Sequence, residues 1–196
     1  MVEVTRLTAL LRIMSSIQRV AVYCGSKIGA LPIYEAAARE LGAALAQHDL
    51  ELVFGATDCG LMGVLARAAV ESGGRVVGIE ARDETAPCVA GLSEKIVVDS
   101  VAGRKAALLE RADALVAVPG GLGTFDELFD ALALRALGEH EKPILLLNVA
   151  GFYDPLLAFL DSAVAAGFVS GSSRALVEVE DDAAVLVARL ATRLRV

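Results

Sequence analysis

The sequence predicts an α/β fold: a doubly wound, mostly parallel sheet of about seven strands with helices on both faces. Short apolar runs alternate with longer helical patterns along the whole chain, as repeated βαβ units require. The run 114–118, for example, is short and apolar throughout, which is typical of a strand buried on both faces of a parallel sheet. A sheet of this kind is Rossmann-like, and it binds ligands at the carboxyl ends of its strands.

The predicted elements follow this alternation. Seven runs are expected to form strands, at 19–24, 51–54, 76–79, 95–98, 114–118, 143–147 and 175–179. Helices are expected between and after them, at 32–48, 61–72, 102–111, 125–137, 155–167 and 181–194. Pro32 suits the first turn of the first helix, and Gly73-Gly74 ends the second. The segment 80–93 carries a proline, a glycine and mixed charge, so we expect an irregular loop there and consider it a candidate lid.

The length of 196 residues suffices for one domain with a large core, and no linker or repeat divides the chain. We expect a single domain at 18–196, preceded by an arm or an extra helix at 1–17. The N-terminal segment lacks a small-residue cleavage site, so no signal peptide is expected. No run approaches the ~20 apolar residues of a membrane span. Three scattered cysteines are typical of a reducing cytoplasm, where we expect the protein.

Charge and composition exclude several functions. A net charge of −7 argues against a nucleic-acid partner, which would need a basic face. No group of His, Cys and Asp has the spacing of metal ligands. Cys24 and Cys59 fall in loops at the expected site, but a thiol nucleophile needs a base partner, and neither His48 nor His140 is placed to act as one. An anionic ligand must therefore be attracted locally, by helix ends and a few cations.

The most informative motif is a glycine loop that runs from Pro119 to Glu127 as Pro-Gly-Gly-Leu-Gly-Thr-Phe-Asp-Glu, directly after the expected strand 114–118. The glycines allow a tight turn and the close approach of a ligand. Thr124 is expected to be the N-cap of the helix 125–137. The start of that helix would point free N–H groups and a positive dipole end at the loop, which predicts a phosphate or carboxylate site.

The loops after the first, second, fourth and fifth strands are expected to meet at one edge of the sheet. They carry the site candidates Gly25-Ser26, Gly55 to Gly60, Arg104-Lys105 and Gly120 to Glu127. Spacing alone leaves two interpretations of most of these residues. Glu127 is either the third-position acid of a capping box with Thr124 or a catalytic carboxylate. The cations Arg104 and Lys105, at a helix start, indicate an anionic partner (a ligand phosphate or Glu127) or are simply solvated.

The glycine loop resembles the PGGxGTxxE motif of the "lonely guy" (LOG) family, cytokinin riboside 5'-monophosphate phosphoribohydrolases long described as lysine decarboxylases. Other segments between about 20 and 169 agree with that family in order and spacing: Val22-Tyr23-Cys24-Gly25-Ser26, Gly60-Leu61-Met62-Gly63, Val97-Val98-Asp99-Ser100, Arg104-Lys105 and Gly151-Phe152-Tyr153-Asp154-Pro155-Leu156-Leu157.

The resemblance implies that Arg104 and Glu127 are catalytic. It implies a larger set of substrate-binding residues from the same motifs: Gly25, Ser26, Gly60, Met62, Lys105, Pro119, Gly120, Gly121, Leu122, Gly123, Thr124 and Asp126. It also implies that no metal or organic cofactor is needed. A homodimer is expected, in which the neighbouring subunit completes the active site.

The chain departs from the family at two places. Gly55-Ala56-Thr57-Asp58-Cys59 stands where the family usually has a triple glycine, so Asp58 is expected to bring negative charge beside the presumed phosphate. Val101-Ala102-Gly103 replaces the Met-His that usually precedes the arginine-lysine pair. Because the catalytic pair and the glycine loop survive, hydrolysis is still expected, although these changes put the substrate pocket in doubt.

The resemblance implies a hydrolase that cleaves the N-glycosidic bond of adenosine 5'-monophosphate (AMP), with or without an N6 modification. The products would be the free base and ribose 5-phosphate. The altered loop keeps a second hypothesis open, a non-catalytic carrier of a phosphorylated ligand similar to molybdenum-cofactor carrier proteins. Under both hypotheses the partner is a small phosphorylated molecule, and neither nucleic acid nor a membrane is expected to bind.

Overall fold

The computed structural model describes residues 17–193 and contains a seven-stranded sheet in which every neighbouring pair is parallel. The strand order is β4-β3-β2-β1-β5-β6-β7. The strands are β1 (Arg19–Tyr23), β2 (Glu51–Phe54), β3 (Val76–Ala81), β4 (Glu94–Val98), β5 (Ala114–Ala117), β6 (Ile144–Leu147) and β7 (Val177–Glu180). The predicted α/β class with about seven parallel strands is therefore confirmed.

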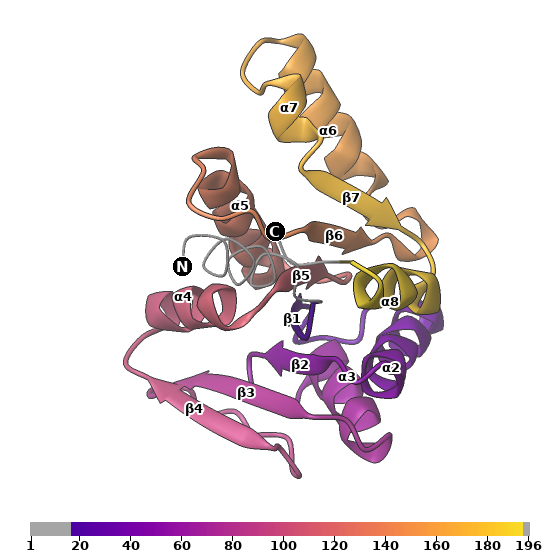
Figure 1. Ribbon diagram of the computed structural model, residues 1–196, viewed down its shortest axis with the longest axis vertical. Helices are drawn as coiled ribbons and strands as arrows, with labels where there is room; N and C mark the ends of the chain where they lie inside the picture. The colour runs from indigo at the N-terminus through magenta and orange to yellow at the C-terminus, as the bar shows by residue number, and fades with distance from the viewer. Residues whose placement is uncertain (1–16, 194–196) are drawn as a thin grey trace, which may run out of the picture.

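Helices cover both faces of this sheet (Figure 1). They are α2 (Pro32–Gln47), α3 (Gly60–Glu71), α4 (Val101–Arg111), α5 (Leu122–Ala136), α6 (Asp154–Ala165), α7 (Gly171–Arg174) and α8 (Ala183–Ala191), with a short 3-10 turn η1 (Val149–Gly151). One apolar core lies between the sheet and α2, α3 and α8, and the other lies beneath α4, α5 and α6. No helix within residues 17–193 is long and apolar enough to cross a membrane.

The start of α5 differs from the prediction. The helix begins at Leu122 with Gly121 as its N-cap, so Thr124 lies within the first turn and is not the cap. The N–H of Phe125 already donates to the carbonyl of Gly121, and the Thr124 side chain is buried against Gly120. The proposed capping box between Thr124 and Glu127 is therefore wrong, because glycine begins the helix without any side-chain cap.

Other boundaries move by a few residues. β3 continues to Ala81, and α7 and η1 were not predicted. The segment 80–93 is mostly irregular after β3, as expected, and an isolated bridge between Thr57 and Cys88 ties it to the loop after β2. The expected arm or helix at 1–17 falls almost entirely outside the described residues.

The strand order reverses between β1 and β5, which are neighbours in the sheet although they are distant in sequence. The helices that follow these two strands pack on opposite faces (Figure 1), so the loops diverge at this point. The backbone N–H of Gly25 donates to the carbonyl of Pro119 at 3.1 Å and holds the two loops together at their base. A ligand site is expected in the crevice that opens beyond such a switch point.

Candidate functional site

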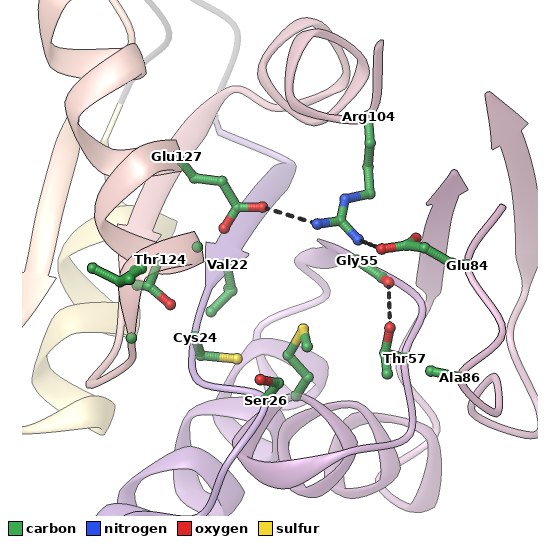
Figure 2. Close-up of a pocket in the computed structure, with 14 residues that line it drawn as sticks. Val22, Cys24, Ser26, Gly55, Thr57, Glu84, Ala86, Arg104, Thr124 and Glu127 are labelled. Atoms are coloured by element: carbon green, nitrogen blue, oxygen red, sulfur yellow. Dashed lines mark hydrogen bonds and ion pairs between the residues drawn. The ribbon is translucent and has the colours of Figure 1, made fainter. Parts of the chain in front are cut away.

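A cavity of about 350 Å³ opens at the carboxyl edge of the strands, beside this switch point. It is built from the end of β1, the loops after β2 and β3, and the first turns of α3, α4 and α5 (Figure 2). The residues that line it are Val22, Cys24, Ser26, Gly55, Thr57, Met62, Glu84, Ala86, Arg104, Gly121, Leu122, Gly123, Thr124 and Glu127. Segments from across the chain therefore converge here, as the motifs predict.

Glu127 projects into the cavity from α5, and its side chain is only 13 % exposed. Burial is the largest influence on this carboxyl group and raises its pKa to about 7. Arg104 and Lys105 oppose that rise, while the negative charges of Asp126 and Glu84 add to it. Near neutral pH, Glu127 can therefore exchange a proton with a reacting group.

Arg104 lies between two acids at the start of α4 (Figure 2). Its Nη1 donates to Oε1 of Glu84, and its Nη2 lies 3.9 Å from Oε1 of Glu127. Its Nε–H is buried and has no hydrogen-bond partner within the described part of the chain. Ser100 caps the helix by accepting from the N–H of Gly103 at 3.0 Å, which fixes the turn that carries the arginine.

The glycines of the glycine loop have two different roles: one is required by close packing, and two others leave space open. A Cβ on Gly120 would collide with the Thr124 side chain, so this position requires glycine. A Cβ on Gly121 or Gly123 would meet nothing within 4 Å. Since the first N–H groups of a helix have no intrahelical acceptor, the start of α5 presents donors to an unobstructed region of the cavity, which suits an anion.

The other residues expected in the site are divided among several places. Ser26 and Met62 line the cavity. Gly25, Pro119 and Gly120 line a second cavity, of about 440 Å³, which shares Ser26, Gly121 and Leu122 with the first.

The remaining expected residues do not line the first cavity. Gly60 has a positive φ of 53° and lies against the backbone of Ser26 and Lys27, so it shapes the loop. Lys105 donates to Asp126 at 3.0 Å, and this pair joins α4 to α5. Both cations at the start of α4 are thus paired with acids.

Asp58 does not bring charge to the cavity as the sequence predicted. Its carboxylate forms an ion pair with Arg67 of α3, and it does not line the site. Two residues before Asp58, Ala56 has a φ of 62°, in the left-handed region. The chain turns there, and Asp58 then faces α3. Thr57 lines the cavity instead, and its hydroxyl donates to the carbonyl of Gly55.

Glu84 is the residue that sequence reasoning missed. It lies in the segment 80–93, for which the sequence predicts an irregular loop and a candidate lid but no site residue. The only sequence signal was the cluster of charges after β3, which has neither helical nor strand periodicity. Cys24 also lines the cavity, but burial raises the pKa of its thiol, so the sulfur remains neutral and unreactive.

Comparisons with known proteins agree with the motifs. Residues 62–190 match the family model described as "Possible lysine decarboxylase". A cytokinin riboside 5'-monophosphate phosphoribohydrolase of Arabidopsis thaliana is 41% identical over 165 residues, which cover 83% of this chain and 78% of that protein. A probable enzyme of the same name from Oryza sativa subsp. japonica is 44% identical over 178 residues, covering 90% and 78% respectively.

Solved structures show the same fold in other proteins. The molybdenum cofactor carrier protein of Chlamydomonas reinhardtii aligns with a TM-score of 0.67 and 27% identity over 88% of this chain and 94% of that one. The molybdenum cofactor binding protein of Rippkaea orientalis aligns with a TM-score of 0.69, at 23% identity and the same coverage. The plant relatives are the more similar in sequence, and together with the family model they show that this chain belongs to the LOG family.

Proposed function

We propose that the chain hydrolyses the N-glycosidic bond of a nucleoside 5'-monophosphate, namely AMP or an N6-substituted AMP. The observation that carries this proposal is the placement of Glu127, a carboxyl group that is only 13% exposed and lies in the same cavity as an open helix N-terminus. The names of the relatives support the reaction and the class of substrate.

Cleavage of such a bond passes through an oxocarbenium-like sugar, as in glycoside hydrolysis. The C1'–N bond breaks and its electron pair leaves with the base, which takes a proton from solvent. A water oxygen bonds to C1', and the carboxylate of Glu127 accepts a proton from that water while its charge stabilises the cationic sugar. Arg104 orients Glu127 from the opposite wall of the cavity.

The phosphate would bind at the start of α5. The N–H groups of Leu122, Gly123 and Thr124 point out of the helix end, and no Cβ blocks the approach at Gly121 or Gly123. Binding the phosphate at this end would leave the ribose beside Glu127, further along the same helix. Lys105 and Asp126, paired next to this surface, would then shape its rim.

The test is incubation with AMP, N6-substituted AMP and the matching unphosphorylated nucleosides, with released base measured by chromatography. We expect release from the monophosphates and much slower release from adenosine, because the nucleoside lacks the anion that binds α5. Equal turnover of adenosine and AMP would refute the phosphate anchor. Arg104→Ala is expected to abolish turnover in a folded protein.

The same incubation, combined with a measurement of ligand binding, tests the second candidate function. The likeness to the carrier protein of Chlamydomonas reinhardtii, together with the altered loop at Gly55 to Cys59, favours a carrier as the alternative. Tight binding of a phosphorylated ligand without release of any base would establish that function in place of hydrolysis.

We also propose that the protein works as a homodimer with a shared active site. α6 has no buried residue although much of its sequence is apolar, and Phe159 and Phe168 are 65% and 88% exposed. Phe168 lines an apolar cavity of about 370 Å³ that is bordered by α5, α6 and α7. A second copy of the chain would cover this surface.

A further inference from the structure

We propose that Glu84 is a positioning residue for the hydrolysis. It holds the guanidinium of Arg104 between two acids, so that Arg104 makes a closer contact with Glu84 than with Glu127. The inference rests on the proposed function for its catalytic meaning. The contacts on which it depends lie within the described chain, so it can be tested separately.

The carboxylate of Glu84 is fixed at both oxygens. Its Oε2 accepts from the backbone N–H of Ala81 at 2.9 Å, and its Oε1 accepts from Nη1 of Arg104. Its own N–H donates to the carbonyl of Ala81 at 2.9 Å, which closes a turn directly after β3. Glu84 is therefore anchored to the end of a strand, although it lies in an irregular segment.

This anchoring determines what Arg104 offers to Glu127. One terminal nitrogen is held by Glu84, and the other remains 3.9 Å from Glu127, beyond the length of a strong charge-assisted hydrogen bond. Without Glu84, the guanidinium would be free to turn both terminal nitrogens towards Glu127. A bidentate arginine stabilises an ionised carboxylate and makes it a weaker base. Glu84 thus keeps Glu127 basic by competing for its partner.

The other groups around Glu127 do not replace this effect. Arg104 and Lys105 face it from α4, Asp126 lies beside it on α5, and Lys105 is already held by Asp126. Tyr23 and Cys24 face it from the end of β1, and burial raises the pKa of both, so they remain neutral. Arg104 is therefore the one cation near Glu127 whose position Glu84 controls.

The first experiment titrates Glu127 in the full unliganded chain, by NMR of carboxyl-labelled glutamate. In Glu84→Gln the midpoint of Glu127 is expected to fall by about one pH unit, because a neighbouring negative charge is removed and Arg104 can move closer. Glu80→Gln is the matched control: Glu80 is an acid near the end of β3, four residues before Glu84, but it pairs with Lys95 at 2.6 Å. Its removal is expected to leave the Glu127 midpoint unchanged.

An unchanged midpoint in Glu84→Gln, or an equal fall in both variants, would overturn the proposal. Glu84→Asp keeps the charge but shortens its reach, and a smaller fall is expected than in Glu84→Gln. If the glutamine variant does not fold, the titration of Glu84→Asp decides, and an unchanged midpoint there also refutes the proposal.

The second experiment measures turnover of AMP against pH. In Glu84→Gln, the acid limb of kcat is expected to move to lower pH by the same amount as the titration midpoint of Glu127, and the plateau of kcat is expected to fall. KM is expected to change by less than about twofold, because the phosphate anchor lies on α5. A loss confined to KM would contradict a positioning role. If the parent chain cleaves no nucleotide but the titration shifts as expected, the proposed function fails while the control of Arg104 by Glu84 stands.

Discussion

Glu127 shows how far a motif determines the role of a single residue. The spacing from Thr124 allowed either a capping acid or a catalytic one, and only the resemblance favoured catalysis. The structure removes the first interpretation, because α5 begins at Gly121 and Glu127 lies beyond the reach of a cap. Burial then has the largest effect on the pKa of this side chain, because it makes ionisation unfavourable in the folded protein.

The first prediction is that Glu127→Gln stabilises the protein at alkaline pH while it removes activity. The pKa of Glu127 rises from 4.5 to about 7 on folding, so the folded state holds this proton more tightly than the unfolded state does. Its stabilising contribution is complete below pH 4.5 and is lost as pH rises through 7. Glutamine does not ionise, so the variant avoids placing a charge in the partly buried site at alkaline pH. The free energy of unfolding at pH 8 should therefore rise by about 1 to 3 kcal/mol.

Turnover of the same variant should fall about 100-fold or more, the scale of a lost general base or charge. The measurements are denaturant unfolding at pH 5 and pH 8, together with AMP cleavage. The gain in stability should be much smaller at pH 5. A variant that loses stability at pH 8, or that retains most of its turnover, would contradict the assignment of Glu127.

Asp58 shows what a motif cannot determine at this scale. The sequence placed its charge beside a phosphate because it stands in a loop that usually consists of glycine. Its orientation depends on the left-handed backbone at Ala56 and on Arg67, which lies nine positions further on in α3. Neither feature is visible as a local pattern, and together they direct the acid to the helix and away from the cavity.

At the scale of elements, the short runs predicted all seven strands to within a few residues. β2, β5 and β6 are buried along their whole length, which leaves little ambiguity, whereas the edge strands β4 and β7 are only partly buried. The start of α5 was placed too late, since threonine is a stronger N-cap signal than glycine. α7 was missed because its four residues, Gly-Ser-Ser-Arg, contain no apolar periodicity. The predicted boundaries were wrong where backbone geometry, and not the pattern of side chains, determines where a helix starts.

The second prediction separates two glycines of the loop that precedes and begins α5. Gly123 lies in the first turn with open space around it, so Gly123→Ala should raise the free energy of unfolding by about 0.5 kcal/mol through helix propensity. It should nevertheless weaken AMP binding, because the new methyl group occupies the space expected for phosphate. Gly120→Ala should instead lower stability by about 1 to 3 kcal/mol, because its methyl group collides with Thr124.

Thermal unfolding and AMP affinity measured on both variants check this prediction. Opposite signs in stability, with a loss of affinity in Gly123→Ala, are the expected pattern. If Gly123→Ala binds AMP as tightly as the parent does, the phosphate does not lie against the start of α5.

At the scale of the whole molecule, the βαβ alternation predicted a parallel sheet, and the family motifs predicted which loops meet. The strand order depends on long-range packing that no short window of sequence contains. It places β3 only two strands from β1, and the bridge between Thr57 and Cys88 then ties the loop after β3 to the loop after β2. Glu84 reached the site through this arrangement, which explains why sequence reasoning found Arg104 and Glu127 but missed the acid between β3 and β4.

The last prediction concerns the outer surface formed by α6 and the segment after it, which lie at the β7 end of the molecule (Figure 1). Phe159 is 65% exposed and Phe168 is 88% exposed, on and just after an α6 that buries no residue, and exposed apolar patches mark interaction sites. We therefore expect the parent chain to be a dimer and the double variant Phe159→Glu, Phe168→Glu to be a monomer, because charged side chains would have to be buried unpaired between the copies. Light scattering coupled to size-exclusion chromatography measures the mass of each.

Val185→Glu is the matched control for that experiment, since Val185 is an exposed apolar residue on α8, on the other face of the sheet. It should remain a dimer. Val185→Glu should unfold near the parent temperature, because Val185 is exposed in the described chain. The double variant should remain folded but unfold at a lower temperature than the parent, because it loses the stabilisation that association provides. If the active site is shared between subunits, the monomeric variant should also lose turnover of AMP. A monomeric parent, or a double variant that remains dimeric, would show that a second copy does not bind through α6.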